Sequence, residues 1–442
     1  MHLSRASGKR TGRQAGMAAR SIGLIHPRCD RACGLLLGLF TGFFLACNDS
    51  ASNTPTSPSS GAVKDTAAVD RSIRVLLVEN IATAQIELEQ AGFALIDAAT
   101  ATPLTTINDQ TTVTIAFDDG DIVFPGLNLS YDHSLIELQP TDPGDWVMVR
   151  RGQAEEFHGP IRILGGTGNV GSIINVIDME EYLVGVVAAE LHRGFDAEAL
   201  QAQAVAARTF AWHEKLTAKP TQFWDLASTE AAQVYRGIEA ARDFPESAEA
   251  VRDTAGLVLT WDGIDTPQII KTYYSSTCGG STQPISEKPI PPLAGNVACD
   301  FCKDSPHYHW KPFTVSLSEA TERLRARYQR FNDFGAIQRV ETETTTEAGR
   351  LVTLRFFDAS GDSITLPAET FRLIMDPSGR SFRSTFCEMK QDGEQLTFVE
   401  GRGFGHGIGM CQYGANGLAK SGKKAAQILR FYYPESTLTR AY

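Results

Sequence analysis

Short stretches of alternating apolar and polar residues characterise the first folded part of the chain. Such period-two runs, bounded by turn residues, predict β-strands, because successive side chains of a strand face opposite sides of a sheet. Turn signals lie at 118–121 and 143–145. Residues 71–165 are therefore expected to form a β-rich accessory region, with strands at residues 75–78, 93–96, 112–117, 146–150 and 161–163.

The pattern becomes helical near residue 178. Asp178 followed by Glu181 has the form of a capping box, which predicts a helix running through Glu190. Asp196 is suited to cap a second, alanine-rich helix over 197–216, whose small side chains allow close packing. Further strands are expected at 256–261, 269–274, 351–357 and 396–400, and further helices at about 316–331 and 415–431.

Together these elements predict an α+β fold. A β-rich N-terminal region is followed by a mixed α+β core over residues 166–442, which contains a glycine-rich turn and a loop-rich segment at 275–312.

The N-terminus has the features of an export leader. Residues 1–47 contain seven Lys/Arg and one Asp, and an uncharged run over 34–46 precedes Cys47. A helix of that length rises roughly 20 Å, which is shorter than the roughly 30 Å hydrocarbon core of a membrane, so the run resembles a signal segment more than a membrane-spanning helix. Leu45-Ala46-Cys47 resembles a lipobox with Cys47 as the lipidated residue, and this favours a lipid-anchored protein over plain secretion or a retained anchor.

Residues 48–70 are rich in Ser, Thr, Pro and Ala and have few large apolar side chains. Such a segment cannot bury enough surface to fold, so it is expected to be a flexible linker between the leader and the folded part. The formal net charge of the whole chain is −11, which argues against a nucleic acid partner. An exported protein of the cell envelope, held at a membrane by a lipid, is the expected localisation.

Glu190 is the first candidate catalytic residue. It lies at the C-terminal end of an apolar helix, where the helix dipole and the apolar surroundings both disfavour a charged carboxylate. A carboxyl group with a raised pKa is suited to general acid catalysis near neutral pH. The alternative is a surface glutamate at a frayed helix end. Arg208, on the alanine-rich helix, either orients a sugar or the catalytic carboxylate, or forms a structural ion pair with Glu190 or Asp178.

Cysteine and histidine spacing indicates a metal site in the loop-rich segment. Cys278, Cys299, Cys302 and His307, with His309 as an alternate, offer thiolate and imidazole ligands that suit tetrahedral Zn²⁺. A closed set of three Cys and one His would be structural, whereas a missing ligand would leave a position for catalytic water. The alternatives are a Cys299–Cys302 disulfide or free buried thiols.

A glycine-rich segment at 401–415 is the last candidate. Alternate glycines allow the backbone to adopt positive φ and to approach a ligand or a strand closely. His406 in this turn is either a core histidine or part of a cleft wall. Cys387 and Cys411 are expected to be buried thiols or a disulfide pair.

Several of these motifs, in this order, resemble the stage II sporulation protein D/amidase-enhancer (SpoIID/LytB) family. The resemblance spans about 165–435 and is densest in the run from Glu181 to Phe210. Shorter matches occur at Gln233-Val-Tyr235, Thr254-Ala-Gly-Leu-Val-Leu259, Tyr274-Ser-Ser-Thr-Cys-Gly-Gly280 and Gly405-His-Gly-Ile-Gly-Met-Cys-Gln-Tyr-Gly-Ala415.

The resemblance implies a lytic transglycosylase that acts on peptidoglycan glycan strands and favours strands stripped of stem peptides. The family's catalytic glutamate falls on Glu190 and its helix arginine on Arg208. The matched motifs add Ser275, His406, Gln412 and Tyr413 as substrate-binding candidates, and the family zinc site maps in part onto Cys278. Zinc is expected to be structural, with no cofactor for catalysis.

The implied mechanism needs one carboxyl group. Glu190 would protonate the glycosidic oxygen and then take the proton of the muramic 6-hydroxyl, which closes a 1,6-anhydro ring, so no second carboxylate has to position water. Some family members are described as amidase enhancers, so a non-catalytic glycan binder that stimulates a partner amidase is the first alternative. A zinc hydrolase that uses the Cys/His cluster is the second.

Overall fold

The computed structural model describes residues 69–88, 92–108, 112–132, 134–142, 145–151, 153–230, 232–263, 267–285 and 288–442. The expected leader, its candidate lipidation residue Cys47 and almost all of the linker expected at 48–70 lie outside these residues. Within the described ranges, no helix combines the length and the apolar character needed to cross a bilayer.

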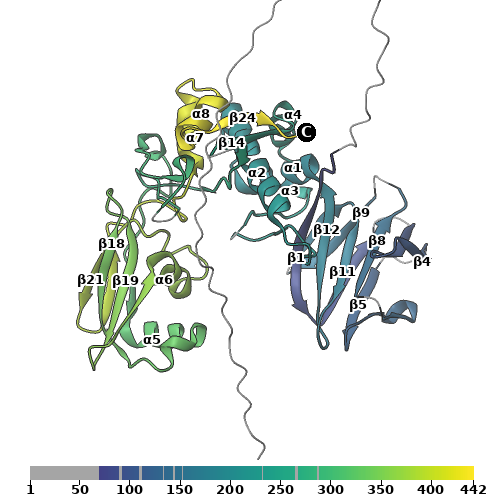
Figure 1. Cartoon of the computed structure of the whole chain (residues 1–442), viewed down its shortest axis with the longest axis horizontal. Helices are drawn as coiled ribbons and strands as arrows, with labels where there is room; N and C mark the ends of the chain where they lie inside the picture. The colour runs from purple at the N-terminus through teal and green to yellow at the C-terminus, as the bar shows by residue number, and fades with distance from the viewer. Residues whose placement is uncertain are drawn as a thin grey trace, which may run out of the picture. The chain divides into compact units, whose positions relative to one another are not determined.

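The first structural region is a pair of β-sheets, drawn in purple and blue in Figure 1. All five strands expected in residues 71–165 are present. One sheet has seven strands in the order β13-β1-β12-β11-β8-β3-β4 and the other has six in the order β10-β9-β2-β5-β6-β7. The strands are β1 (Ser72–Ile81), β2 (Thr83–Leu88), β3 (Phe93–Asp97), β4 (Thr102–Ile107), β5 (Thr112–Asp118), β6 (Asp121–Phe124), β7 (Leu129–Tyr131), β8 (Leu135–Pro140), β9 (Trp146–Arg151), β10 (Gln153–His158), β11 (Ile161–Gly165), β12 (Gly171–Asp178) and β13 (Leu226–Ala227).

The two sheets pack closely where small residues face large ones. A Cβ atom at Gly171 would lie 2.1 Å from the Phe117 ring, so only glycine leaves room for that aromatic side chain. Strand β12 pairs antiparallel with both β1 and β11. The domain boundary expected after residue 165 therefore falls between two hydrogen-bonded strands of one sheet.

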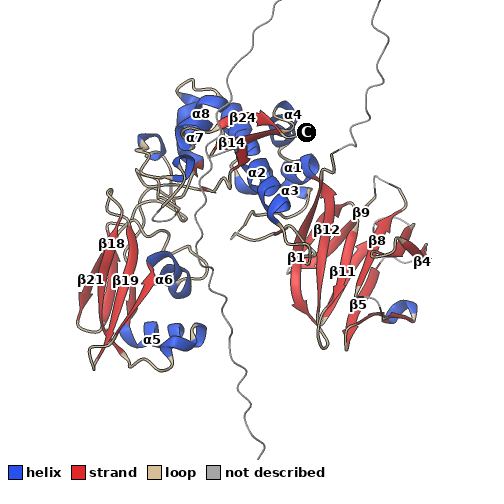
Figure 2. Ribbon diagram, in the orientation of Figure 1, coloured by secondary structure: helices blue, strands red, loops and turns tan. Residues whose placement is uncertain are grey.

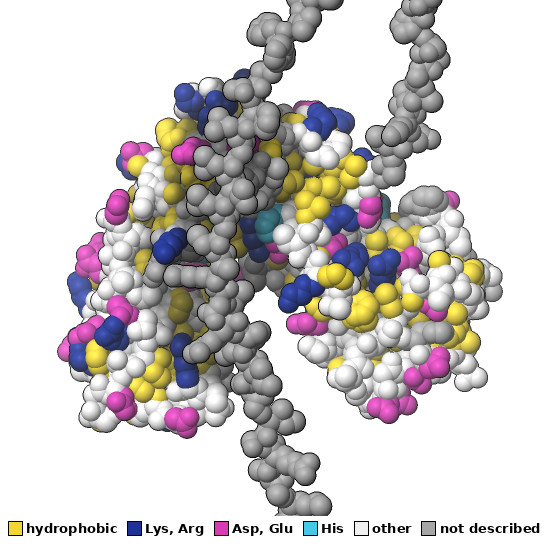
Figure 3. All heavy atoms as spheres, in the orientation of Figure 1, with side chains coloured by type: hydrophobic (Ala, Val, Ile, Leu, Met, Phe, Trp, Pro, Cys, Tyr) yellow, Lys and Arg dark blue, Asp and Glu magenta, His cyan; other side chains and the backbone are white. Residues whose placement is uncertain are grey.

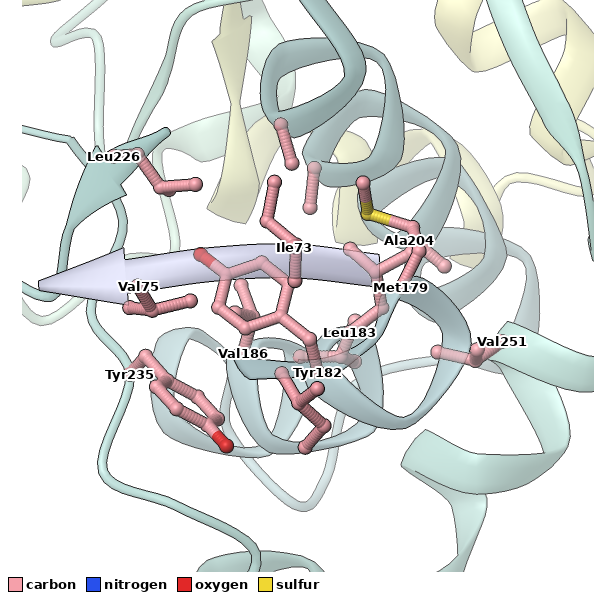
Figure 4. Close-up of a cluster of buried hydrophobic side chains, with 14 of the residues drawn as sticks. Ile73, Val75, Met179, Tyr182, Leu183, Val186, Ala204, Leu226, Tyr235 and Val251 are labelled. Atoms are coloured by element: carbon pink, nitrogen blue, oxygen red, sulfur yellow. The ribbon is translucent and has the colours of Figure 1, made fainter. Parts of the chain in front are cut away.

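Strand β12 leads directly into helix α1 (Met179–Glu190), which packs against helix α2 (Ala197–Thr217). Asp178 caps α1 by accepting the Glu180 N–H at 2.9 Å. The other half of the expected capping box is absent, because the Glu181 carboxylate contacts the ring of His158 instead. Apolar side chains from α1, α2 and the first strands meet in one buried cluster (Figure 4), which includes Ile73, Val75, Met179, Tyr182, Leu183, Val186, Ala204 and Leu226.

Helix α2 is buried along most of its length, as its alanine content predicts. The C-terminal helices, yellow in Figure 1, pack beside it. The elements of this core are α3 (Glu239–Arg242), α4 (Pro245–Asp253), α7 (Gln412–Lys420), α8 (Ala425–Tyr432), β14 (Leu257–Asp262), β15 (Pro267–Ile269), β16 (Tyr274–Ser275), β23 (Met410–Cys411) and β24 (Thr437–Arg440).

Two expectations for this core were wrong. The single strand expected over 269–274 is divided between β15 and β16, which belong to different sheets. The single C-terminal helix expected over 415–431 is two helices, because Gly422 adopts φ +87°, a left-handed conformation that ends α7. Helix α7 also begins earlier than expected, at Gln412.

A second lobe is inserted between β16 and β23 and has its own aromatic core. Figure 2 shows its strands in red with helices α5 and α6 beside them. Phe382 and Phe398 lie 4.3 Å apart, and Phe356 and Phe371 lie 5.4 Å apart. The expected helix over 316–331 ends early and continues as a 3-10 turn. The elements of this lobe are β17 (Phe313–Ser316), β18 (Ile337–Thr345), β19 (Leu351–Asp358), β20 (Ser363–Pro367), β21 (Glu388–Asp392), β22 (Gln395–Val399), α5 (Leu317–Arg327), α6 (Ala368–Met375) and the 3-10 turn Gln329–Phe331. Two further 3-10 turns, Pro291–Leu293 and Asp300–Cys302, lie in the loop-rich segment before β17, and a third, Pro125–Leu127, lies between β6 and β7 of the first region.

The fold is therefore α+β, as the sequence predicts, and residues 67–442 form one unit. On the face shown in Figure 3, acidic and basic side chains are interspersed over the described surface.

Candidate active site

A pocket of about 850 Å³ lies where the core and the second lobe meet. Its walls come from the end of α1, the loop before α3, strand β16, the glycine-rich loop at 401–409, the start of α7, and helix α6 with the turn after it. The pocket brings together the following predicted site residues: Glu190, Ser275, His307, His406, Gln412 and Tyr413.

Glu190 is the last residue of α1 and is only partly exposed, on the pocket side. Its Oε1 accepts the backbone N–H of Val234 at 2.9 Å, and its Oε2 accepts the side-chain amide of Gln412 at 3.2 Å. Burial raises the pKa of Glu190 above its ordinary value, and the nearby Glu230 adds to the rise, while the two hydrogen bonds oppose it. The helix dipole at this C-terminus also favours the neutral acid.

The loop that holds Glu190 is itself fixed by the motif Gln233-Val-Tyr235. Gln233 accepts the Tyr182 hydroxyl at 2.9 Å and donates to the Ala207 carbonyl at 3.1 Å, so it joins the loop to both α1 and α2. The Tyr235 hydroxyl reaches Asn175 Oδ1 on β12 at 3.1 Å. These contacts leave the Val234 N–H aimed at the carboxylate.

Gln412 is placed by the short parallel pairing of β16 with β23, in which Ser275 lies opposite Cys411. Sequence reasoning assigned Gln412 to the substrate. The structure gives it a different contact, because its amide donates to Glu190. Ser275 lines the same pocket, and its buried hydroxyl has no hydrogen-bond partner within the described residues, so it is free to bond a ligand.

The glycine-rich loop lies directly against β16. A Cβ atom at Gly409 would lie 2.0 Å from the Tyr273 carbonyl oxygen, and one at Gly405 would lie 3.0 Å from Ser275 Cβ. Both glycines also have positive φ, which favours glycine, and at Gly409 the close approach excludes any other residue as well. This arrangement brings the ring of His406 to the pocket wall.

His406 is held in a defined tautomer by its own loop. Its Nδ1 accepts the Ile408 N–H at 3.0 Å, which leaves the proton on Nε2. Burial lowers the pKa of His406 to about 4, although Glu369 opposes the fall, so the ring is neutral at neutral pH. Both alternatives left open by the sequence apply, since the ring is well surrounded and also lines the cleft.

Arg208 does not reach the pocket, so its prediction as a substrate-binding residue is not supported. It is fully buried, and its guanidinium forms a bidentate pair with Glu180, at 2.9 Å from Nε to Oε1 and 2.6 Å from Nη2 to Oε2. Further bonds go to the carbonyls of Val251 and Leu257. The partner is therefore neither Glu190 nor Asp178, and Arg208 joins α1 to α4 and β14.

Four buried cysteines form a cluster that could hold a metal ion: Cys278, Cys299, Cys302 and Cys411. Their sulfur atoms lie within 4.8 Å of one another, and no disulfide joins the cysteines of the described residues. Three of the four ligands match the sequence prediction. The prediction of His307 as the fourth ligand was wrong, because its ring lines the pocket instead. Cys411, expected to be a lone thiol or a partner of Cys387, takes the fourth position because β23 returns beside β16.

The surroundings of the cluster suit thiolates. Cys411 Sγ accepts the N–H groups of Cys278 at 3.2 Å and Gly414 at 3.3 Å, and Cys299 Sγ contacts the Tyr432 hydroxyl at 3.1 Å. Donors of this kind stabilise the charged form of sulfur. Tetrahedral Zn²⁺ with Zn–S bonds of about 2.3 Å would place sulfurs about 3.8 Å apart, and Cys278 and Cys302 sulfurs are 3.6 Å apart.

Sequence reasoning missed the pocket walls that depend on tertiary structure. Glu230 and Val234 lie in an irregular loop, and Glu369 and Arg372 come from α6 of the inserted lobe. The motif Gln233-Val-Tyr235 was a usable signal for the loop wall, since it contains Val234 and lies three residues after Glu230. No sequence signal places α6 at the pocket.

Comparison with known proteins supports one family for the core. Residues 168–261 match the stage II sporulation protein family, and residues 298–409 match a domain of unknown function (DUF8618). The chain is 31% identical over 281 residues to a stage II sporulation protein D of Bacillus subtilis, which covers 60% of this chain and 75% of that protein.

Two other relatives show similar identity. An uncharacterized protein of Brachyspira hyodysenteriae is 30% identical over 271 residues, or 59% of this chain and 66% of that protein. An amidase enhancer of Bacillus subtilis is 30% identical over 303 residues, or 58% of this chain and 40% of that protein. The chain thus spans less than half the length of the amidase enhancer.

Proposed function

Because the chain belongs to the stage II sporulation protein D family, we propose that it cleaves peptidoglycan glycan strands as a lytic transglycosylase. The observation that carries the proposal is Glu190, a pocket carboxyl group with a raised pKa and no cationic partner among the described residues. A neutral carboxyl group in a cleft is the proton donor that breaking a glycosidic bond requires.

In the proposed reaction, Glu190 donates its proton to the oxygen that links N-acetylmuramic acid to N-acetylglucosamine. The bond from C1 to that oxygen breaks, and C1 develops positive charge. The Glu190 carboxylate then accepts the proton of the muramic 6-hydroxyl as that oxygen bonds C1, which yields a 1,6-anhydro product. No water enters the products, so no second carboxylate has to hold one.

The remaining pocket groups have supporting roles. Gln412 and the Val234 N–H hold the carboxylate and stabilise it after it has lost its proton. Ser275, with its unpartnered hydroxyl, and Tyr413 are proposed to bind the sugar. Neutral His406 adds an aromatic wall without introducing a positive charge next to the acid.

We propose that the four-cysteine cluster binds Zn²⁺ in a structural role. Cys278, Cys299, Cys302 and Cys411 would be its ligands, and four thiolates fill a tetrahedral shell, which leaves no position for a catalytic water. The ion would fasten the loop-rich segment to the start of α7. A zinc hydrolase is therefore disfavoured by the chemistry of the ligand set.

The experiment that tests the enzyme proposal compares wild type with Glu190→Gln on purified glycan strands. We expect anhydro-muropeptides from wild type and none above background from the variant. Glu181→Gln is the matched control, because it makes the same change on the same helix outside the pocket. Equal product from wild type and Glu190→Gln would reject the proposal.

A second candidate function rests on the similarity to an amidase enhancer. In that case the chain binds glycan and stimulates a partner cell-wall amidase without chemistry of its own. Glu190→Gln would then retain both glycan binding and amidase stimulation, and neither protein's digest would contain anhydro products.

Export and lipid anchoring at Cys47 remain a proposal from the leader. Metabolic labelling with a radioactive fatty acid should mark the wild-type protein and leave Cys47→Ser unmarked. Labelling of both proteins, or of neither, would contradict anchoring through Cys47.

A further inference from the structure

Arg350 is a buried cation of the inserted lobe. It directly precedes β19, and only 1% of its surface is exposed. Two other buried arginines have carboxylate partners: Arg208 pairs with Glu180, and Arg372 pairs with Glu369. No ion pair of this kind joins Arg350 to a carboxylate in the part of the chain that the structure describes. A buried charge without a partner is strongly destabilising, so this guanidinium requires a countercharge from another source.

The Arg350 side chain reaches from its lobe to the core. Its Nη2 donates to the backbone carbonyl of Cys278 at 2.6 Å, and its guanidinium carbon lies 5.0 Å from the centroid of the Phe386 ring. A Cβ atom at Gly407 would lie 2.6 Å from Nη2, so the glycine-rich loop packs directly against the same group. The buried Nη1 has no hydrogen-bond partner among the described residues. The guanidinium is therefore enclosed between the lobe and the glycine-rich loop with its charge unmatched.

Three nearby side chains would favour the guanidinium when they are negatively charged: Cys278, Glu369 and Cys387. Glu369 already forms a bidentate pair with Arg372. Burial raises the pKa of the Cys387 thiol to about 12, so that group is neutral at neutral pH. Cys278 remains, and it is one of the four proposed zinc ligands. A cysteine that binds a metal ion does so as a thiolate, so metal binding would supply the missing negative charge.

The four-cysteine cluster has the complementary problem. Four thiolates contribute −4 and one Zn²⁺ contributes +2, so a loaded cluster of four buried cysteines would carry a net charge of −2. The groups that contact the sulfurs, two backbone N–H groups and the Tyr432 hydroxyl, are neutral. Lys303 follows Cys302, but it is exposed and paired with Asp300 at 2.8 Å, so solvent screens its charge. The loaded cluster thus requires a buried cation.

We propose that Arg350 is the countercharge of the metal-loaded four-cysteine cluster. The inference rests on the proposed zinc site and goes beyond it, because it assigns to that site a residue from the two-sheet lobe, which supplies none of the ligands. Arg350 is a positioning residue, since it bonds the backbone of a ligand and not the ion. Helix α6 belongs to the same lobe and forms one wall of the pocket. Arg350 would therefore connect metal binding to the attachment of that wall.

Zinc affinity tests the proposal on the full-length protein, by competition with a chromogenic chelator of known affinity. Arg350→Gln keeps a donor for the Cys278 carbonyl and removes the charge, whereas Arg350→Lys keeps both a donor and the charge. We expect Arg350→Gln to weaken zinc binding by about 10- to 100-fold, as is typical for loss of a residue that supports a metal ligand. Arg350→Lys should lose much less. Equal affinity of wild type and Arg350→Gln, or equal losses in the two variants, would overturn the proposal.

Arg325→Gln is the matched control. Arg325 belongs to the same lobe and also donates to backbone carbonyls, those of Phe331 and Phe334. Its replacement should leave zinc affinity at the wild-type value, and a loss equal to that of Arg350→Gln would reduce the effect to a general weakening of the lobe. Circular dichroism in excess Zn²⁺ shows which variants fold. Failure of both Arg350 variants to fold would show that the shape of the guanidinium matters and its charge does not, which also overturns the proposal. Failure of Arg350→Gln alone would support it.

Co²⁺ in place of zinc gives a second, spectroscopic readout. The charge-transfer band from thiolate sulfur to Co²⁺ reports the electrostatic potential at the sulfurs. Removal of a neighbouring positive charge raises the energy of the sulfur electrons, so the band should move to longer wavelength in Arg350→Gln and stay at its wild-type position in Arg350→Lys. A purely structural arginine would leave the band in place in both variants, and that result would contradict the proposal.

These outcomes are distinct from those that test the zinc site itself and the enzyme. Wild-type protein without stoichiometric zinc would reject the zinc site and the role of Arg350 together. Stoichiometric zinc with unchanged affinity in Arg350→Gln would keep the zinc site and reject Arg350. Neither result depends on whether Glu190 cleaves glycan strands.

Discussion

Helix α1 has a functionally different glutamate at each end. Glu180, in the first turn, bonds the Arg208 guanidinium, the Tyr442 hydroxyl and the Gly256 N–H. Glu190, the last residue, bonds only the Gln412 amide and the Val234 N–H within the described residues, and no cation faces it there. The same residue type in one helix therefore meets opposite electrostatic surroundings.

The two pKa values accordingly move in opposite directions. Burial raises the pKa of Glu180, but Arg208 and Tyr442 outweigh burial and lower it overall. Burial also raises the pKa of Glu190, and weaker neutral donors do not reverse that rise. The helix dipole reinforces both shifts. It favours a charged carboxylate at the N-terminus, where Glu180 lies, and a neutral carboxyl group at the C-terminus, where Glu190 lies. The comparison shows that burial raises the pKa of a glutamate in this helix only where no cation lies beside its carboxyl group.

The largest expected effect is the loss of stability when the ion pair between Arg208 and Glu180 is removed. Arg208→Met leaves the partly buried Glu180 without its cation, and we expect the free energy of unfolding to fall by about 3 kcal/mol. Arg193→Met removes an exposed ion pair with Asp243 and should change the free energy of unfolding by less than about 1 kcal/mol. Chemical denaturation of both variants measures the difference. Similar small losses would show that the Glu180 pair is not structural.

The stability conferred by this pair should also depend on pH. Because the folded-state pKa of Glu180 is lowered, its contribution is complete above the unfolded-state pKa and disappears as pH falls through the folded-state value. Wild type should therefore lose stability on acidification, and Glu180→Gln should lose less. Parallel acid-unfolding curves would contradict this.

The next effect concerns the position of the proposed acid. Gln412→Met removes a donor that favours the charged form, so the pKa of Glu190 should rise further and the fall of kcat/KM at high pH should move to higher pH. Poorer positioning should slow turnover by about 10-fold. Gln395→Met, at an exposed glutamine of β22, is the control. An unchanged pH profile would remove Gln412 from the acid's surroundings.

A smaller effect is the change in stability when either glutamate of α1 is replaced by glutamine, which is expected to have opposite signs at the two ends. The folded-state pKa of Glu190 is raised, so its favourable contribution exists at low pH and is lost as pH rises through that value. Glu190→Gln should therefore stabilise the protein at neutral pH by on the order of 1 kcal/mol, while Glu180→Gln should destabilise it. Thermal unfolding at neutral pH measures both. Destabilisation by both would mean that Glu190 serves the fold.

The smallest effect is that of Glu230, an exposed acid on the pocket wall. Its charge raises the pKa of Glu190, so Glu230→Gln should shift the basic limb of the pH profile slightly downward. Salt screens such exposed charges, so the shift should shrink at high ionic strength. Glu239→Gln, at an exposed position outside the pocket, should leave the profile unchanged. A shift that persists in high salt would exclude simple electrostatics.

Local sequence predicts local structure in this chain. Asp178 and Asp196 begin the expected helices, and alternating runs give the expected strands. Pairings distant in sequence were not predictable in the same way. Cys411 joins Cys278 only because β23 returns beside β16 after the whole inserted lobe, and spacing within residues 278–307 favoured His307 instead.

The same reasoning explains the outcome for the site. Glu190 could be identified because a helix C-terminus and apolar neighbours act locally on its carboxyl group. Arg208 could not be assigned, because its partner, Glu180, is set by how α1 packs against α2. The contribution of α6 to the pocket depends on the placement of the second lobe.

The most direct test of the central claim is mass spectrometry of peptide-free glycan strands digested by wild type, Glu190→Gln and Glu181→Gln. We predict 1,6-anhydromuramic ends from wild type and Glu181→Gln, and a loss of at least about 100-fold in Glu190→Gln. Anhydro ends formed at the wild-type rate by Glu190→Gln would contradict the assignment of Glu190 as the proton donor.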